Sequence, residues 1–195
     1  MQVEDSVYYV GKQFERSALP VRGTKETQFE DCTFKNCDLT EFNFTGCDFT
    51  NTTFEECNFS MLKLGYIGLD KVDFKGCKMV GADFSNVKDF LFNARFTNCI
   101  LDYAAFMKKK NRKGFFSSCS LKGADFSETD LTDTQFERCD LTATVFMNTI
   151  LNGANFATSF NFTIDPERNS LKKAKFSADG LAGLLTKYGI IVAGN

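Results

Sequence analysis

The sequence predicts an all-β solenoid with four-sided coils, followed by a short C-terminal α-helix and a terminal strand. Three observations predict this class. From Phe29 onward, a Phe, Leu or Met recurs at almost every fifth position, and a mostly small residue stands two positions before it. The identity of the large residue in turn repeats about every twenty positions. A repeat this regular indicates a chain built from stacked copies of one unit.

A five-residue period excludes the two common regular structures. An amphipathic helix requires apolar residues about every 3.6 positions, and a half-buried strand requires them at every second position. In extended backbone, residues two apart point to the same side, so the small and the large residue of each unit both face inward. The last two residues of the unit then turn the corner. One unit cannot bury its apolar face alone, so the coils must stack into a solenoid.

Four units make one coil, because the large inward residues, which we call anchors, fall into four series. We name the four sides of the coil after these series. The anchors of side b are all Phe: Phe34, Phe54, Phe74, Phe96, Phe116, Phe136 and Phe156. Those of side c are Leu39, Phe59, Met79, Leu101, Leu121 and Leu141. Those of side d are Phe44, Leu64, Phe84, Phe106, Phe126 and Phe146. On side a the series is Phe29, Phe49 and Leu69, then a gap, then Asn111, Leu131 and Leu151.

The eight cysteines all occupy the small inward position. Cys32 and Cys47 lie on other sides, and six form a column on side c: Cys37, Cys57, Cys77, Cys99, Cys119 and Cys139. A column of thiols can indicate a metal or disulfide site. However, the chain has no Cys-x-x-Cys pair, and a free cysteine packs as a small apolar residue. We therefore expect free thiols, with no metal and no cofactor.

The overall composition argues against several classes of protein. The chain has no His, which excludes Ser-His-Asp and Cys-His arrangements, and we expect a protein that is not an enzyme. A net charge of −2 gives no global basic field, so we expect no direct binding of nucleic acid. No apolar run is long enough to span a membrane, and the N-terminus lacks the pattern of a signal peptide. We expect a cytoplasmic protein, in which thiols remain reduced.

The C-terminal segment has the signals of a cap over the last coil. After the Asp165-Pro166 turn, Ser177 is a candidate helix N-cap, and an apolar stripe at helical spacing follows it. Gly189 is expected to end the helix, and Ile190 to Val192 to form a short apolar strand. A solenoid needs such a cap to cover its open edge.

The repeat unit resembles that of the pentapeptide-repeat family. Good matches to the family pattern are ADFSN at 82–86, ADFSE at 124–128, TDLTD at 129–133 and CDLTA at 139–143. The resemblance implies a right-handed quadrilateral β-helix. It also divides the chain into an N-terminal cap or first irregular coil at 1–26, the β-helix at 27–161, and a cap or dimerisation segment at 162–195.

The tail resembles the ending of the Qnr and McbG subgroup of this family. That resemblance implies a homodimer, for which the contact residues would be Leu181, Leu184, Leu185, Tyr188, Ile190, Ile191 and Val192. It also implies a protein partner, DNA gyrase or topoisomerase IV, that is protected from quinolones or peptide toxins. Two mechanisms are associated with the subgroup: mimicry of duplex DNA by the rod, and contact through loops that project from it.

The outward positions offer some support for DNA mimicry. Carboxylates gather near both ends of the repeat region, with few cations beside them, and the candidate mimic surface comprises Asp38, Glu41, Asp48, Glu55, Asp125, Glu128, Asp130, Asp133 and Asp140. The alternative is that any soluble solenoid requires polar outward residues.

Two irregularities fall on side a of consecutive coils. A slip of two residues lies around 86–92, and the basic run Lys108–Lys113 replaces the side-a unit of the next coil. Because Lys109 and Asn111 occupy inward positions that are costly for polar groups, we expect this unit to bulge outward. Together the irregularities predict one topoisomerase-interaction patch: Val87, Lys88, Asp89, Phe90, Lys108, Lys109, Lys110, Asn111, Arg112 and Lys113.

The loops that this patch would form are shorter than those of Qnr proteins and closer to McbG. A different reading is a structural or protein-interaction solenoid with no topoisomerase target. The two irregularities on side a and the tail favour a topoisomerase-binding protein over such a solenoid, because a featureless spacer needs neither feature.

Overall fold

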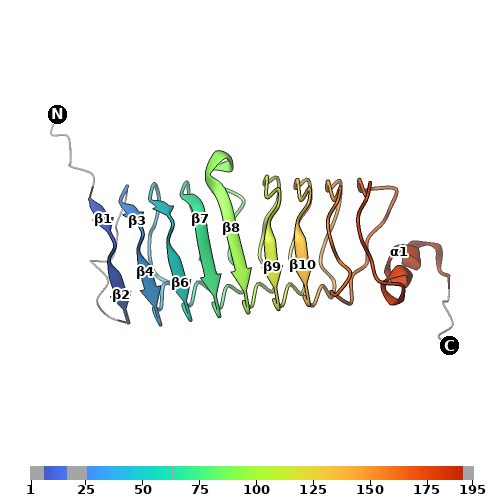
Figure 1. The fold of residues 1–195 in the computed structure, drawn as a ribbon, viewed down its shortest axis with the longest axis horizontal. Helices are drawn as coiled ribbons and strands as arrows, with labels where there is room; N and C mark the ends of the chain where they lie inside the picture. The colour runs from blue at the N-terminus through green and yellow to red at the C-terminus, as the bar shows by residue number, and fades with distance from the viewer. Residues whose placement is uncertain (1–6, 17–25, 63, 191–195) are drawn as a thin grey trace.

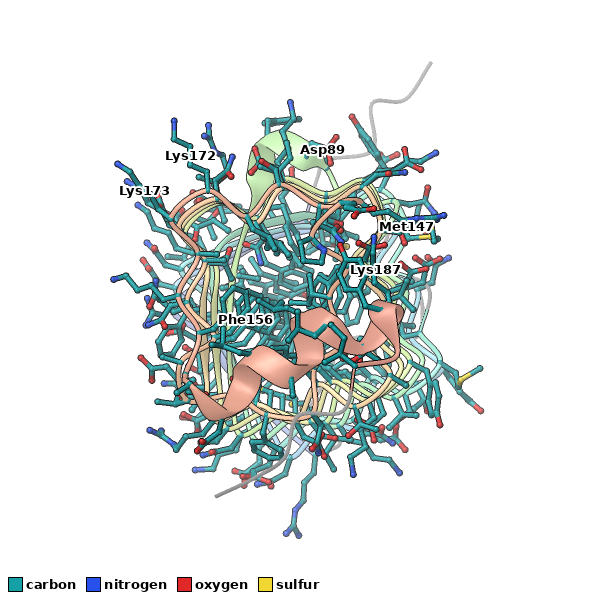
Figure 2. All side chains as sticks on the ribbon, turned by 90° about the vertical axis from the view of Figure 1, so that its right-hand side faces the viewer. Asp89, Met147, Phe156, Lys172, Lys173 and Lys187 are labelled. Atoms are coloured by element: carbon teal, nitrogen blue, oxygen red, sulfur yellow. The ribbon has the colours of Figure 1, made fainter. Side chains whose placement is uncertain are left out.

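The computed structural model describes residues 7–16, 26–62 and 64–190. Over these residues the chain winds into a rod of stacked coils, with the N-terminal strands at one end and a short helix at the other (Figure 1). Viewed along the rod, the coils superpose as a four-sided outline filled by side chains, as shown in Figure 2. The fold is the four-sided parallel β-helix that the repeat predicts, with the right-handedness that the family resemblance implies, and the prediction of the fold class is confirmed.

Parallel pairing between successive coils joins the strands of sides a and b. On side a the strands are β1 (Tyr8–Val10), β3 (Gln28–Glu30) and β5 (Asp48–Thr50). On side b they are β2 (Gln13–Glu15), β4 (Thr33–Lys35) and β6 (Thr53–Glu55). β7 (Gly68–Lys75) turns the corner and pairs with both β5 and β6. It is followed by β8 (Phe92–Thr97), and then by β9 (Phe115–Ser117) and β10 (Gln135–Glu137) on side b.

The other two sides are held by single bridges rather than by named strands. Asp38 pairs with Asn58 on side c, and Asp83 pairs with Ala105 on side d. Because β1 pairs with β3 and β2 with β4, the described residues 7–16 extend sides a and b of the same solenoid.

The anchors form continuous columns in the core. On side b, the rings of Phe96 and Phe116 have centroids 5.0 Å apart and planes only 6° apart, and Phe116 and Phe136 are 5.1 Å apart. Neighbouring columns meet edge to face, as in Phe116 and Phe126 at 5.8 Å and 83°. Burial of one such ring contributes about 2 to 3 kcal/mol to stability, and each favourable ring pair adds about 1 kcal/mol.

The small inward position does more than leave room for the anchors. The Cys57 thiol donates to the carbonyl oxygen of Phe34 in the preceding coil at 3.4 Å, and the Thr129 hydroxyl donates to that of Phe106 at 2.9 Å. A small side chain with a donor therefore links one coil to the next, which explains why Cys, Thr and Ser are common there. All eight cysteines are buried free thiols in the structure.

The first part of the C-terminal segment continues the solenoid, because Ser170 pairs with Ile150 and Lys175 with Asn155. A single short helical stretch follows it. It comprises the 3₁₀ turn η2 (Asp179–Leu181), the helix α1 (Ala182–Leu185) and a second 3₁₀ turn, η3 (Thr186–Tyr188). The Ser177 hydroxyl accepts the Gly180 N–H at 3.1 Å, and Gly189 ends the stretch with a left-handed φ of 63°. Gly189 therefore ends the stretch as predicted, whereas the N-cap position is Ala178, one residue after the predicted Ser177. Most of the predicted terminal strand, at Ile191 and Val192, lies outside the described residues.

In the part of the chain that the structure describes, no helix is long and apolar enough to cross a membrane.

Candidate functional site

A loop projects from side a between β7 and β8, and it is visible in Figure 1 as the protrusion between these strands. The coil is regular as far as Lys88, whose N–H donates to Ile67 in the preceding coil at 2.8 Å. The 3₁₀ turn η1 (Asp89–Leu91) then leaves the side, and the chain returns at Phe92. Phe92 pairs in register with Leu69 and is buried. It is therefore the side-a anchor of this coil, and the gap expected in that series is wrong.

The slip is thus an insertion with partial compensation. Three residues, η1, are added before the anchor Phe92, and only three residues separate Phe92 from the next anchor, Phe96, instead of four. A register shift between Asp70 and Val72 in β7 accommodates the shorter connection. The solenoid resumes its normal register at Phe74 and Phe96.

The prediction that the basic run bulges outward is wrong. Lys109 and Asn111 point inward with only 5% and 3% of their surfaces exposed. The backbone keeps its pairing to the following coil, where the Asn111 N–H donates to Asp130 at 2.9 Å. The expected cost of burying Lys109 is offset because the loop of the preceding coil supplies its hydrogen-bond partners, which reasoning from the unit alone did not include.

The Lys109 ammonium makes two contacts with the loop. It donates to the carbonyl oxygen of Val87 at 2.8 Å and to a carboxylate oxygen of Asp89 at 2.7 Å. Val87, at the base of the loop, is buried, and Asp89 begins the turn η1. The two irregularities that the sequence placed side by side are therefore in direct contact.

A second lysine holds the other flank of the loop. The Lys88 ammonium lies 2.6 Å from a carboxylate oxygen of Asp48, two coils earlier, and 5.3 Å from the centre of the Tyr66 ring. Between them on side a stands Gly68, which has no side chain to obstruct the path. The Lys88 side chain is largely covered, so this ion pair is less screened than one at the open surface.

Asn111 lies in the core without a partner for its side-chain nitrogen. Among the described residues, its Nδ2 atom is one of two buried side-chain atoms with no hydrogen bond. Its backbone carbonyl is satisfied, because it accepts the Thr134 hydroxyl at 2.9 Å. The surroundings are tight, since a Cβ atom at Gly114 would lie 2.6 Å from Nδ2.

The exposed part of the patch combines one aromatic ring with cations. Phe90, in the loop, is 79% exposed. The Arg112 guanidinium lies 3.4 Å from Asp130, whereas Lys108, Lys110 and Lys113 are exposed and form no ion pair among the described residues. Figure 2 shows Asp89 projecting from the outline of the rod. Of the ten predicted patch residues, Val87, Lys109 and Asn111 are buried, so they support the surface instead of forming it.

The candidate acidic surface is not gathered on one face. Asp48 and Asp130 lie on side a, Glu55 on side b, Asp38 and Asp140 on side c, Asp125 on side d, and Glu41, Glu128 and Asp133 at three different corners. Several are paired with cations: Asp48 with Lys88, Asp130 with Arg112, Asp140 with Lys122 at 3.3 Å, and Glu55 with Lys35 at 3.7 Å. A partner that approaches one side would therefore meet only part of this set.

The candidate dimer residues split between the core and the surface. Leu184 packs against the last coil and Leu185 is half-buried, whereas Leu181, Tyr188 and Ile190 are exposed. Ile191 and Val192 are not among the described residues. The end of the helical stretch is tied to the rod because the Lys187 ammonium lies 2.9 Å from Asp165 and the Tyr188 hydroxyl donates to Glu167 at 2.7 Å.

The charges around Lys187 perturb each other. The hydrogen bond from Lys187 lowers the pKa of both Asp165 and Glu167, and the same carboxylates, Glu167 first, raise the pKa of Lys187. This group has the character of a structural clasp. Within the described chain, no three Cys, Asp or Glu side chains are arranged to hold a metal ion.

Comparisons with known proteins agree with this architecture. A model of the pentapeptide repeat region matches residues 27–106, and a model of eight pentapeptide repeats matches residues 119–157. The two matches together span most of the chain, which belongs to the pentapeptide-repeat family. A search of curated protein sequences finds no significant match.

Several solved structures align with this chain over most of its length. A trypsin-treated variant of QnrB1, a plasmid-mediated fluoroquinolone resistance protein, aligns with a TM-score of 0.47 and 22% identity over 96% of this chain and 98% of that chain. HetL, a pentapeptide repeat protein involved in heterocyst differentiation regulation from the cyanobacterium Nostoc, aligns with a TM-score of 0.36 and 14% identity over 88% and 84%.

One of the contacts was within reach of the sequence. The ion pair between Asp48 and Lys88 joins residues forty positions apart, which is two coils of the regular repeat. The pair between Asp89 and Lys109 does not follow from the period, because the slip lengthens this coil and places Val87, not Asp89, one coil before Lys109.

Proposed function

We propose that this chain is a non-enzymatic protein that binds a type II topoisomerase, DNA gyrase or topoisomerase IV, and protects it from poisons such as quinolones or peptide toxins. The observation that supports this proposal most is Phe90, which is 79% exposed on a loop held at both flanks by ion pairs. An exposed aromatic ring on a supported loop has the properties of an interaction hot spot, because little freedom is lost when it is buried.

The charges around Phe90 indicate the chemistry of the partner surface. Lys108, Lys110 and Lys113 form a basic rim beside the loop, and they have no ion pair within the described part of the chain. The best complement is an apolar pocket bordered by carboxylates on a protein, because electrostatic complementarity directs encounter and fixes orientation. A duplex nucleic acid fits this surface less well, since Asp89, Asp130 and Glu128 stand among the cations.

We also propose that the chain forms a homodimer, and the exposed residues of the tail support this. Leu181, Tyr188 and Ile190 leave apolar surface exposed at the C-terminal end of the rod. Burial of this surface against a second copy would remove it from water. Light scattering at micromolar concentration measures the mass directly, and a monomer there would exclude the dimer.

DNA mimicry has a smaller part in this proposal. The nine carboxylates lie on all four sides and at three corners, and four of them are paired with cations. The mimicry is therefore confined to those carboxylates that share a side with the loop.

The test is a supercoiling assay with DNA gyrase, titrated with the protein in the presence and absence of a fluoroquinolone or a peptide poison, with topoisomerase IV relaxation in parallel. The wild-type chain is expected to restore activity in the presence of poison. Phe90→Ala is expected to weaken protection by at least about tenfold, the typical effect of one hot-spot residue.

The matched control is Tyr103→Ala. Tyr103 is 71% exposed, but it lies at the corner between sides c and d, away from the loop. We expect this variant to protect as the wild type does. If the wild-type chain protects neither enzyme from any of these poisons, the alternative of a protein-interaction solenoid without a topoisomerase target holds instead.

A further inference from the structure

Lys109 occupies a position that holds a small or aliphatic residue in the other coils. The series along side a reads Thr27, Cys47, Ile67, Val87, Lys109, Thr129 and Thr149. The threonines that follow Lys109 each bond to the coil before them, as Thr149 does to Phe126 at 2.9 Å. Lys109 has a longer reach, and its ammonium ends at the base of the loop instead.

The Lys109 ammonium replaces a hydrogen bond of the backbone ladder. On side a, the residue after the small position donates its N–H to the small position of the preceding coil: Lys88 to Ile67 and Asp130 to Lys109, each at 2.8 Å. By this rule Lys110 would donate to Val87. Among the described residues, the Val87 oxygen instead accepts from the Lys109 side chain at 2.8 Å. The side chain of Lys109 therefore takes the place of the backbone N–H that would otherwise donate to Val87.

The second contact makes the loop and the lysine depend on each other. Lys109 is buried, and a buried ammonium is stable only when hydrogen bonds and a counter-charge replace its lost water. Its counter-charge is Asp89, the first residue of η1, at 2.7 Å. If the loop swings away, the charge remains buried without a partner. The loop is therefore held in the conformation that keeps Asp89 over Lys109.

We infer that Lys109 is a positioning residue, which fixes η1 in the conformation that presents Phe90 and keeps the loop ordered in the free protein. Lys88 holds the other flank through Asp48. A loop ordered before binding loses less entropy when a partner binds. The effect of the loop on binding rests on the proposed function. The ordering of the loop by Lys109 does not, because it is a property of the free chain.

The first experiment needs no partner. Lys109→Met keeps an unbranched apolar chain in the position and removes the charge. Hydrogen exchange of the amides at 88–92 is expected to become at least about tenfold faster, while that of β9 remains unchanged. Lys110→Met is the matched control, because it removes an exposed charge from the next residue, and its loop exchange should equal that of the wild type.

A double-mutant cycle separates this contact from a general loss of packing. Asp89→Asn is expected to speed loop exchange in the wild-type background and to add little in the Lys109→Met background. Exchange in Lys109→Met equal to that of the wild type, or effects of the two substitutions that simply add, would overturn the inference. If Lys109→Met does not fold, Asp89→Asn alone decides, since it alters only an exposed loop residue.

The binding arm uses purified DNA gyrase and topoisomerase IV. Lys109→Met is expected to lower the affinity by about tenfold, because the buried residue acts through Phe90. The control in this arm is Lys78→Met, which removes an exposed charge on side c, opposite the loop, and should leave the affinity unchanged. If the wild-type chain binds neither enzyme, the proposed function fails while the exchange result still stands. A variant with a mobile loop that binds as tightly as the wild type would overturn the positioning role.

Discussion

Two polar residues of one repeat unit are buried in this core, but only one of them has hydrogen-bond partners for its side chain. Lys109 finds two partners and closes the backbone ladder, whereas the neighbouring inward residue, Asn111, keeps an unpaired nitrogen. On the sequence alone, burial of either side chain is costly for the same reason, the desolvation of a polar group. The difference is the reach of the side chain: the lysine extends to the loop of the preceding coil, and the asparagine does not.

Asn111→Leu is expected to raise the free energy of unfolding by about 1 to 2 kcal/mol, because it removes an unsatisfied buried amide and restores an apolar anchor of similar size. Chemical denaturation followed by circular dichroism measures the change. The matched control is Asn93→Leu on the outward side of β8, which should be close to neutral. A loss of stability in Asn111→Leu would mean that the amide is satisfied in solution, for example by a buried water.

The cysteine column yields a prediction about reactivity. Burial raises the pKa of the Cys32 thiol, and burial together with the neighbouring Cys57 raises that of Cys37 to about 11. Since the thiolate is the reactive form, Cys32 and Cys37 are protonated at pH 8. Hydrogen bonds from neighbouring thiols lower the pKa of Cys57, Cys99 and Cys139, so the slow reaction expected of these three rests on their burial alone. A chromogenic thiol reagent should react slowly with the native protein and then titrate all eight thiols in denaturant. Rapid labelling of the native chain would show that the coils open readily.

For the loop as an element, the repeat predicts its position but not the point at which the chain returns to side a. The position of the irregularity and its contact with the next coil follow from counting in fives and twenties. The five-residue spacing does not identify Phe92 as an anchor, because Phe92 lies eight residues after Phe84 and four before Phe96. Only the pairing of Leu69 with Phe92 reveals that the inserted and deleted residues leave the anchor series unbroken.

The C-terminal clasp predicts a dependence on pH. Lys187 lowers the pKa of Asp165 and Glu167 below their unfolded values of about 3.9 and 4.3. Their contribution to stability is therefore present above those values and is lost as pH falls through the lower folded values. The pKa of Lys187 is raised, so its contribution is present below about 10.4 and is lost as pH rises through the higher folded value.

Hydrogen exchange of α1 tests the clasp directly. After correction for intrinsic rates, protection should be constant from about pH 5 to 9 and should fall at more acidic pH, because the carboxylates become protonated there. Lys187→Met should lower the protection and flatten this dependence. Lys172→Met, which removes an exposed lysine without an ion pair among the described residues, is the matched control. An unchanged profile in Lys187→Met would show that packing of Leu184 alone holds the helix.

For the whole molecule, the sequence was sufficient for the fold because the repeat over-determines it. Stacked rings such as Phe34 and Phe54, 4.7 Å apart, repeat the same contact from coil to coil, so an error in one unit leaves the rest in register. The surface has no such redundancy. Whether Asp38 and Asp48 share a face depends on which side of the coil each unit occupies, and here they lie on opposite sides, c and a.

That separation allows the two mechanisms of the proposed function to be told apart. Asp38 and Asp140 lie on side c, opposite the loop, so they cannot contact a partner that is bound at side a. Asp38→Asn combined with Asp140→Asn should therefore change the affinity for DNA gyrase by less than about threefold, as expected for screened surface charges. Lys108→Gln with Lys110→Gln and Lys113→Gln, on the loop side, should weaken binding clearly and reduce its dependence on salt. The reverse ranking would mean that the enzyme reads the acidic rod as it reads duplex DNA, and that the loop is secondary.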